Sequence, residues 1–127
     1  MREIKFRAWD KGNNEMFIPY SIEFGKNRVF KDPTSLVYFK NVGLMECTGL
    51  KDLKGNEIYE GDIQGNEIYE GDILSNDEEC YKVVFENGSY RAEYADGFED
   101  YSLDLIDVAH CCEIVGNIYE NPELLED

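Results

Sequence analysis

Apolar and polar side chains alternate over short stretches along most of this chain of 127 residues. Near the start, Ile4, Phe6 and Ala8 are separated by bulkier or polar neighbours, and the run Lys-Gly-Asn-Asn at 11–14 supplies a turn before residues 16–18. A period of two is typical of β-strands, and Gly and Asn favour the turns that join them. This pattern predicts an N-terminal β-hairpin and disfavours a helix bundle.

The same alternation continues through the first half of the sequence. Residues 21–24 and 28–30 flank the turn Gly25-Lys26-Asn27, whose Gly and Asn tolerate a positive φ. Residues 32–35 interrupt the pattern, and we expect a loop there with one helical turn after Pro33. Two further strands are predicted at 36–39 and 43–47.

In the second half, residues 81–86 and 89–94 alternate on either side of Asn87-Gly88, the strongest short signal for a hairpin in the chain. We expect another turn at 95–97, a last strand at 113–119 and a helical turn at 121–125, where Asn121 precedes a Pro. We also expect Ser102 to cap a helical turn, with these side chains facing inward: Leu103, Leu105 and Ile106.

A nine-residue sequence, GNEIYEGDI, occurs twice, at 55–63 and 65–73. Each copy contains a turn, a short extended piece and a second turn. Because the period of ten is even, a shift by one copy leaves every side chain on its original face, so either copy could occupy the same place. We expect one copy to lie in the fold and the other to form a protruding loop or an extra hairpin.

Charge is distributed very unevenly. Residues 1–54 contain ten Lys and Arg and seven Asp and Glu, whereas residues 55–127 contain two and twenty-one, which gives the net charge of −16. The acidic half is therefore unsuited to binding nucleic acid, which requires cations at the phosphates. It could attract a basic partner, as a mimic of nucleic acid does, or serve solubility alone. The opposite signs of the halves also allow head-to-tail self-association.

The four cysteines show no spacing typical of a disulfide framework, and we expect reduced thiols. His110, Cys111 and Cys112 are adjacent potential zinc ligands, but neighbours on a strand point to opposite faces. The position of His110 after an apolar run is typical of the entry to a strand rather than of a catalytic turn. We assign no catalytic, metal-binding or cofactor-binding residue.

Two other groups of side chains allow a functional interpretation and a structural one. On strands, Glu60 and Asp62 would share a face, as would Glu70 and Asp72, and could meet a hard cation, although solvated acidic surface is the simpler interpretation. Aromatic side chains could form a peptide-binding groove, although in small β folds they belong more often to the core or to cross-strand pairs. They are Trp9, Tyr59, Tyr69, Tyr81, Tyr90 and Tyr94.

Four ordered segments carry a resemblance to a known family. They are REIKFRAWD at 2–10, MECTGLKD at 45–52, GNEIYEGDI at 55–63 and IVGNIYENPELL at 114–125. Together they resemble the YopX family of phage and prophage proteins. The resemblance implies an SH3-like barrel in the C-terminal part, no known enzyme activity and a single copy of the repeated motif, so the second copy departs from the family pattern.

We therefore expect a mainly β protein of many short antiparallel strands with minor helical turns. A β-rich N-terminal subdomain should cover residues 1–45, and a small SH3-like barrel with the duplicated segment and a C-terminal tail should cover 46–127. No run of about 20 apolar residues could span a membrane, so we expect a soluble protein of the host cytoplasm. We expect a non-enzymatic protein-interaction module with no nucleic-acid or membrane partner. A structural homo-oligomer is the alternative, and a small hydrolase using His110 is a more distant one.

Overall fold

The computed structural model describes residues 4–53, 66–95 and 102–125. The fold is mainly β, with antiparallel sheets and short helical turns, as the alternation of side chains predicts. The chain divides into two compact units, Met1–Cys47 and Thr48–Asp127, where the sequence suggested a division after residue 45. Each unit has its own buried core, and each is described separately below.

The first unit contains two small groups of strands. In one, β1 is paired on one side with β2 and on the other with β6; in the other, β4 lies between β3 and β5. Two 3₁₀ turns, η1 and η2, follow β3 and β5. The elements are β1 (Phe6–Asp10), β2 (Glu15–Phe17), β3 (Ser21–Glu23), η1 (Phe24–Lys26), β4 (Arg28–Asp32), β5 (Ser35–Tyr38), η2 (Phe39–Asn41) and β6 (Val42–Lys51).

The core of the first unit is small and forms between the strands. Ala8, Val29 and Val42 are buried, and side chains including Phe17 and Val37 pack against them. Ala8 is paired with Phe17 of β2, so the predicted N-terminal hairpin is confirmed. Strands with one buried face require this register because a slip by one residue would turn the apolar side chains to solvent.

The turns of the first unit follow the sequence signals with one exception. The hairpin between β3 and β4 is confirmed, and Asn27 has the positive φ of +52°. The helical turn expected after Pro33 is wrong, because β5 begins at Ser35 and leaves only a tight two-residue turn. Asp32 Oδ1 closes this turn by accepting hydrogen bonds from the Thr34 N–H at 2.8 Å and the Thr34 hydroxyl at 2.9 Å.

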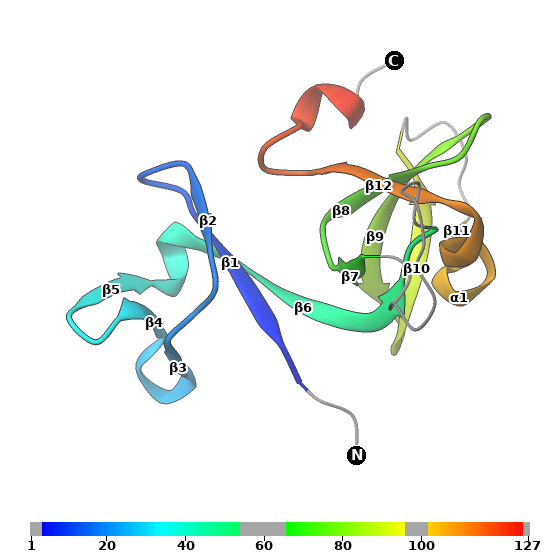
Figure 1. Cartoon of the computed structure of the whole chain (residues 1–127). Coiled ribbons are helices and arrows are strands. Elements are labelled where there is room, and N and C mark those ends of the chain that lie inside the picture. The colour runs from blue at the N-terminus through cyan, green and yellow to red at the C-terminus, as the bar shows by residue number, and fades with distance from the viewer. Residues whose placement is uncertain (1–3, 54–65, 96–101, 126–127) are drawn as a thin grey trace, which may run out of the picture. The chain divides into compact units, whose positions relative to one another are not determined.

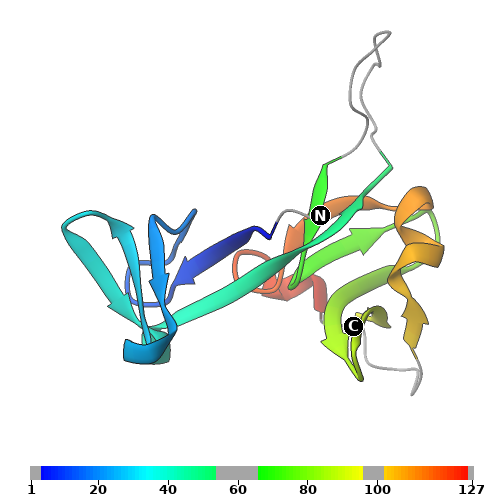
Figure 2. The same ribbon diagram turned by 90° about the horizontal axis from the view of Figure 1, so that it is seen from below.

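The second unit is built on a five-stranded antiparallel sheet in the order β11-β10-β9-β8-β12. The sheet curls into a half-barrel, which Figure 1 shows from the side and Figure 2 from below. The short strand β7 is hydrogen-bonded to β6 instead. The elements are β7 (Glu67–Tyr69), β8 (Asp72–Ser75), β9 (Cys80–Glu86), β10 (Ser89–Tyr94), β11 (Ser102–Asp104), α1 (Leu105–Val108), η3 (Ala109–Cys111), β12 (Glu113–Asn117) and η4 (Pro122–Leu125).

The predicted hairpin around Asn87-Gly88 is confirmed and forms the centre of this sheet. Asn87 and Gly88 have φ values of +52° and +84°, as expected for a two-residue turn whose twist matches that of the strands. The register places Tyr81 opposite Tyr94 and Phe85 opposite Tyr90. The alternation in this segment therefore determined both the strands and their pairing.

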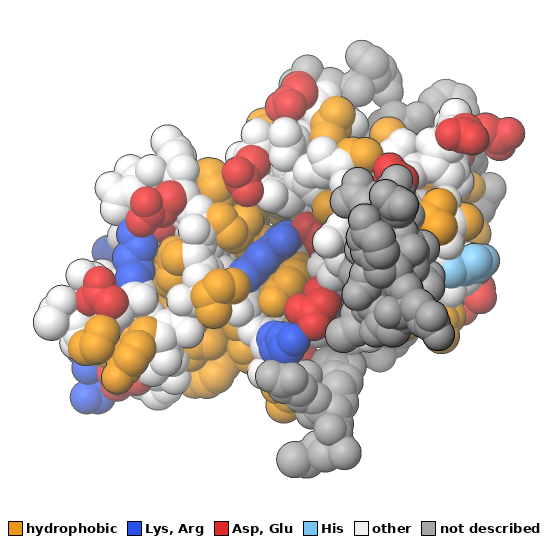
Figure 3. Space-filling model, in the orientation of Figure 1, with side chains coloured by type: hydrophobic (Ala, Val, Ile, Leu, Met, Phe, Trp, Pro, Cys, Tyr) orange, Lys and Arg blue, Asp and Glu red, His pale blue; other side chains and the backbone are white. Residues whose placement is uncertain are grey.

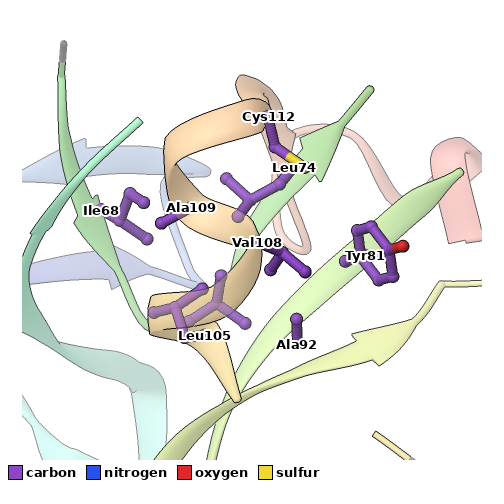
Figure 4. Close-up of a cluster of buried hydrophobic side chains, with 9 residues drawn as sticks. Ile68, Leu74, Tyr81, Ala92, Leu105, Val108, Ala109 and Cys112 are labelled. Atoms are coloured by element: carbon purple, nitrogen blue, oxygen red, sulfur yellow. The ribbon is translucent and has the colours of Figure 1, made fainter. Parts of the chain in front are cut away.

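A single helical turn, α1, covers the core of the half-barrel. Figure 4 shows Leu105 and Val108 of this turn, together with Ala109 of the following η3, pointing toward Leu74, Ala92 and other sheet side chains. The fully or nearly fully buried members of this cluster are Ile68, Leu74, Tyr81, Val83, Ala92, Leu105, Val108, Ala109 and Cys112. A cluster of aliphatic and aromatic side chains of this kind supplies most of the free energy that favours the folded unit.

The expectation for Ser102 and Ile106 is wrong. Ser102 lies in β11, where it pairs with Glu93 of β10, and the helical turn begins only at Leu105. Extending the sheet satisfies more backbone hydrogen bonds than a Ser cap does. Leu105 and Val108 are three residues apart and share the buried face of the turn, which leaves Ile106 66% exposed.

Residues 66–73 of the second copy of the repeat lie within the fold. Ile68 and Ile73 are completely buried, and Glu70 and Gly71 connect β7 to β8. The first copy, at 55–63, lies outside the described residues, as does most of the turn expected at 95–97. The prediction that one copy lies in the fold is therefore confirmed, and the prediction for the other copy concerns residues outside the described ones.

The C-terminal end folds as expected. The last strand is β12, and the helical turn η4 follows it, with the Leu124 N–H donating to the Asn121 carbonyl oxygen at 3.1 Å. In β12 the register shifts between Ile114 and Gly116. A Cβ at Gly116 would lie 2.5 Å from Asn121 Oδ1, so only glycine fits beside that side chain.

Candidate protein-interaction surface

The His-Cys-Cys run does not form a strand entry as predicted, because His110 and Cys111 belong to the 3₁₀ turn η3. Both are exposed, and the Cys111 thiol donates a hydrogen bond to the Val108 carbonyl oxygen at 3.2 Å. Cys112 is completely buried. Cys112 therefore lies in the core, away from the two exposed side chains, and within residues 4–53, 66–95 and 102–125 no group of three metal-binding side chains converges.

Burial also determines the reactivity of Cys112. Removal from water raises the pKa of its thiol to about 12, and the neighbouring Cys111 contributes to this rise. A thiol with so high a pKa is protonated at neutral pH and is a poor nucleophile. Cys111 is the accessible thiol of this pair.

The carboxylates in the second copy of the repeat, Glu70 and Asp72, do not share a strand face as predicted. Glu70 lies in the turn beside Gly71, whose φ is +85°, and not on a strand with Asp72. Asp72 is buried, and its Oδ2 accepts a hydrogen bond from the Tyr69 N–H at 2.8 Å, which closes the turn between β7 and β8. Glu60 and Asp62 lie outside the described residues.

The aromatic side chains of the described residues support the interpretation as core and cross-strand pairs. Trp9 and Tyr81 are buried. The rings of Tyr81 and Tyr94 are 5.1 Å apart, and those of Phe85 and Tyr90 are 5.0 Å apart and nearly perpendicular. Such pairs stabilise neighbouring strands. Of the others, Tyr69 is half-buried and Tyr59 lies outside the described residues.

Sequence reasoning overlooked a structural role for Asp52. This buried carboxylate accepts hydrogen bonds from two backbone N–H groups, that of Asn66 at 2.5 Å and that of Ile114 at 2.8 Å. It therefore joins the chain after β6 to the start of β7 and to β12. The only signal in the sequence is that Asp52 ends one of the four family-like segments, which says nothing about burial.

The exposed acidic side chains belong almost entirely to the second unit. Residues 48–127 contain four Lys and Arg and twenty-two Asp and Glu, a net charge of −18, whereas residues 1–47 contain eight and six, a net charge of +2. Where the half-barrel lies at the right of Figure 3, this face shows red Asp and Glu side chains and the pale-blue histidine, but no Lys or Arg in dark blue. The exposed acidic residues are Glu67, Asp77, Glu78, Glu79, Glu86, Asp104, Asp107, Glu113, Glu120 and Glu123.

The acidic residues are most concentrated at the turn between β8 and β9. Asn76 Oδ1 accepts hydrogen bonds from the Glu78 N–H at 2.8 Å and the Glu79 N–H at 2.7 Å, and Asn76 N–H donates to the Glu79 carbonyl oxygen at 3.0 Å. These bonds fix a turn that presents Asp77, Glu78 and Glu79 to solvent.

A hollow of about 290 Å³ lies beside this turn, and we call it the acidic hollow. It combines two carboxylates, Asp77 and Glu113, with two exposed apolar side chains, Leu53 at 48% and Val115 at 45%. Its complete lining is Leu53, Ser75, Asn76, Asp77, Cys111, Glu113 and Val115. A negative rim beside an apolar floor is suited to a Lys or Arg side chain, which has a charged head on an aliphatic stem.

Two ion pairs of the second unit involve carboxylates that do not line the acidic hollow. Lys82 pairs with Glu93 at 3.2 Å, and Arg91 pairs with Asp104 across neighbouring strands. In the described part of the second unit, these ion pairs therefore do not neutralise Asp77 or Glu113.

No helix of the described residues has the length and apolar character needed to cross a membrane.

Comparisons with known proteins give a consistent result. A family model described as YopX protein matches residues 5–67 and 62–126, so each matched stretch contains one complete copy of the repeat. A crystal structure of the protein EF1440 from Enterococcus faecalis has 26% sequence identity and a TM-score of 0.66, covering 99% of this chain and 100% of that one. No curated protein matches.

A second solved structure supports the fold alone. The crystal structure of the protein YopX from Bacillus subtilis has 19% sequence identity and a TM-score of 0.51, and the alignment covers 97% of this chain and 96% of that one. Both solved proteins are similar to this chain over its whole length. Neither is described by a reaction, substrate or partner.

Proposed function

Since this chain belongs to the YopX family, we propose that it is a non-enzymatic protein-interaction module whose acidic second unit binds a basic partner protein. Within this proposal the protein is of phage or prophage origin and acts in the host cytoplasm. The observation that carries it is the acidic hollow, where Asp77 and Glu113 adjoin the exposed Leu53 and Val115. Solubility alone accounts for dispersed carboxylates but not for exposed apolar side chains beside them.

The chemistry of the hollow indicates what it would recognise. An Arg or Lys side chain can place its charged head at the two carboxylates and its aliphatic stem along the apolar pair. The net charge of −18 on the second unit would attract a basic surface from a distance and raise the rate of encounter. The hollow would then select the position at which the partner binds.

Two observations favour this role over a small hydrolase. The lone His110 is exposed on a 3₁₀ turn, and Cys112, two residues further on, is buried with the pKa of its thiol raised to about 12. A nucleophile requires access to substrate and an ionised or activated thiol, and Cys112 has neither. A His110→Ala variant should therefore retain every measurable property of the protein.

The proposal is tested by measuring, with fluorescence anisotropy, how tightly the protein binds a labelled short peptide of alternating Arg and Leu. We expect binding that weakens strongly between about 50 mM and about 0.5 M salt, since screening acts on exposed charges. Glu113→Lys should weaken binding roughly fivefold more than Glu86→Lys, which makes the same change of net charge at an exposed site on β9. Binding should also slow alkylation of Cys111, which lines the hollow.

The matched pair of variants separates a local site from a general field. Equal weakening by Glu113→Lys and Glu86→Lys would show that only net charge matters and would remove the hollow from the proposal. A molecular size that rises with protein concentration in the absence of any partner would favour the structural homo-oligomer instead.

A further inference from the structure

A second hollow, of about 530 Å³, lies on the first unit, and we call it the aromatic hollow. It is lined by Lys26, Asn27, Tyr38, Phe39 and Lys40. The lining residues come from the end of η1, the end of β5 and the start of η2. Its character is opposite to that of the acidic hollow, because both of its charged side chains are lysines.

Backbone hydrogen bonds hold the two sides of the aromatic hollow together. The Phe39 N–H donates to the Asn27 carbonyl oxygen at 2.8 Å, and the Asn27 N–H donates to the Phe24 carbonyl oxygen at 3.2 Å. Asn27 adopts the left-handed conformation with φ of +52°, which turns the chain between η1 and β4. The hollow is thus part of the folded backbone and does not depend on the arrangement of long side chains alone.

Aromatic side chains in and beside this hollow are exposed to solvent. Tyr38 is 49% exposed, and Phe24, whose ring lies 6.0 Å from that of Phe39, is 61% exposed. Exposed apolar surface beside charged groups is a common property of binding sites. The aromatic rings are therefore available to an apolar side chain from outside.

The two lysines provide positive charge at the edge of this hollow. The Lys26 ammonium lies 3.8 Å from Glu23, a carboxylate that Arg28 already contacts at 3.1 Å. Lys40 is exposed and forms no ion pair with any residue of the described segments. Both ammonium groups can therefore accept a further anionic partner at little cost.

We propose that the aromatic hollow binds a short segment of a second partner protein in which a carboxylate stands next to a large apolar side chain. The carboxylate pairs with Lys26 and Lys40, and the apolar side chain packs on Tyr38 and Phe39. This site lies in the first unit and does not depend on the acidic hollow.

Charge decides between this occupant and two others. A nucleic acid carries one charge per nucleotide, and the net charge of −16 on the chain opposes it far more strongly than it opposes a segment with one or two carboxylates. A second copy of the chain also carries −16, so two copies repel each other as whole molecules. A short, sparsely charged peptide segment is least affected by this repulsion.

The test is an amide NMR titration of the whole protein with the blocked peptide Ac-Glu-Leu-Phe-Glu-NH₂, called the Leu peptide, whose sequence does not occur in this chain. We expect shifts concentrated at residues 26–27 and 38–40. The peptide Ac-Lys-Leu-Phe-Lys-NH₂ should not bind, and Ac-Glu-Ser-Ser-Glu-NH₂ should bind more weakly because it lacks the apolar side chains. Equal binding of the Ser peptide, or shifts spread over both units, would overturn the proposal.

Variants then locate the site. Lys40→Glu should weaken binding of the Leu peptide roughly fivefold, near the upper limit for one exposed ion pair, and Lys40→Gln should have an intermediate effect. Lys11→Glu is the matched control, because it changes the net charge by the same amount at a residue that does not line the hollow. Lys11 is nevertheless close to it, since the Lys11 N–H donates a hydrogen bond to the carbonyl oxygen of Asn41, the residue after Lys40. Tyr38→Ala should also weaken binding without unfolding the unit, since Tyr38 is exposed.

Three outcomes would refute this assignment. One is equal weakening by Lys40→Glu and Lys11→Glu with unchanged spectral dispersion. Another is that oligothymidylate binds more tightly than the Leu peptide and shifts the same amide signals. A third is a concentration-dependent increase in molecular size that Lys40→Glu abolishes, which would make a second copy the occupant. None of them bears on binding at the acidic hollow, so the two proposals fail independently.

Discussion

Asp10 is the position at which a single substitution should reveal most about the first unit. It lies at the end of β1, is only 3% exposed, and places Oδ2 2.7 Å from Lys31 Nζ. Its Oδ1 accepts hydrogen bonds from the backbone N–H groups of Gly12 at 3.0 Å and Asn13 at 3.2 Å. Asp10→Asn keeps an oxygen for these two bonds but removes the charge opposite Lys31.

The size of the effect follows from the pKa of Asp10. The hydrogen bond from Lys31 is the largest cause that lowers this pKa from 3.8 to about 2, against the opposing effect of burial. A pKa depressed in the folded state stabilises the fold above the unfolded pKa, and this contribution is lost as the pH falls through the folded pKa. It amounts to about 2 kcal/mol, and roughly half is lost by about pH 3.

The assay is the free energy of unfolding by urea, measured from neutral pH to about pH 3 for the wild type and Asp10→Asn. We expect the variant to be less stable by about 2 kcal/mol at neutral pH, with the gap narrowing by about 1 kcal/mol at the acid end. Taking the difference between the two proteins cancels the titration of the other carboxylates. A difference in the free energy of unfolding between the two proteins that does not change with pH would refute the reasoning.

Substitution of Glu15 is a control that separates the effect of burial on stability from the effect of the shared partner Lys31. Glu15 contacts the same lysine, but its side chain is 55% exposed. Glu15→Gln should therefore cost less than about 1 kcal/mol at neutral pH, as is usual for an exposed ion pair. A cost equal to that of Asp10→Asn would mean that the charge on Lys31 matters and the burial of Asp10 does not.

Other substitutions test single features of the second unit. Gly116→Ala should destabilise it by about 1–3 kcal/mol in urea unfolding, because the new Cβ would lie 2.5 Å from Asn121 Oδ1. Gly88→Ala should cost about 1 kcal/mol for a different reason, since its φ is +84° although nothing lies within 4 Å of the added Cβ. Iodoacetamide followed by mass mapping should modify Cys111 well before Cys112, and equal rates would contradict the burial and raised pKa of Cys112.

Much of the fold was predictable because local signals agreed with the tertiary structure. The alternation on either side of Asn87-Gly88 determined two strands, their turn and their register. The predictions failed where a local signal competed with another interaction. Ser102 was expected to cap a helix but joined the edge of the sheet, and the turn after Pro33 was closed by the Asp32 side chain.

The candidate surfaces were predictable only in part. The sign of the net charge on each half of the chain follows from its composition, so the acidic character of the second unit could be predicted. The hollows could not, because each gathers residues from separate elements: Leu53, Asp77 and Glu113 in one, and Lys26 and Lys40 in the other. No spacing in the sequence shows which exposed side chains will be neighbours.

The sequence by itself determined the mainly β architecture, the principal hairpins and the separation of charge, since these depend on interactions between residues close in the chain or on simple counting. Only the tertiary structure decided which acidic residues are structural. Asp10, Asp52 and Asp72 are all buried and accept hydrogen bonds from backbone N–H groups, whereas Asp77 is exposed beside a hollow. The reason is physical: a buried carboxylate is stable only where partners satisfy its oxygens. Turns supply nearby N–H groups to Asp10 and Asp72, but Lys31 beside Asp10 and both N–H partners of Asp52 come from distant segments that only packing brings together.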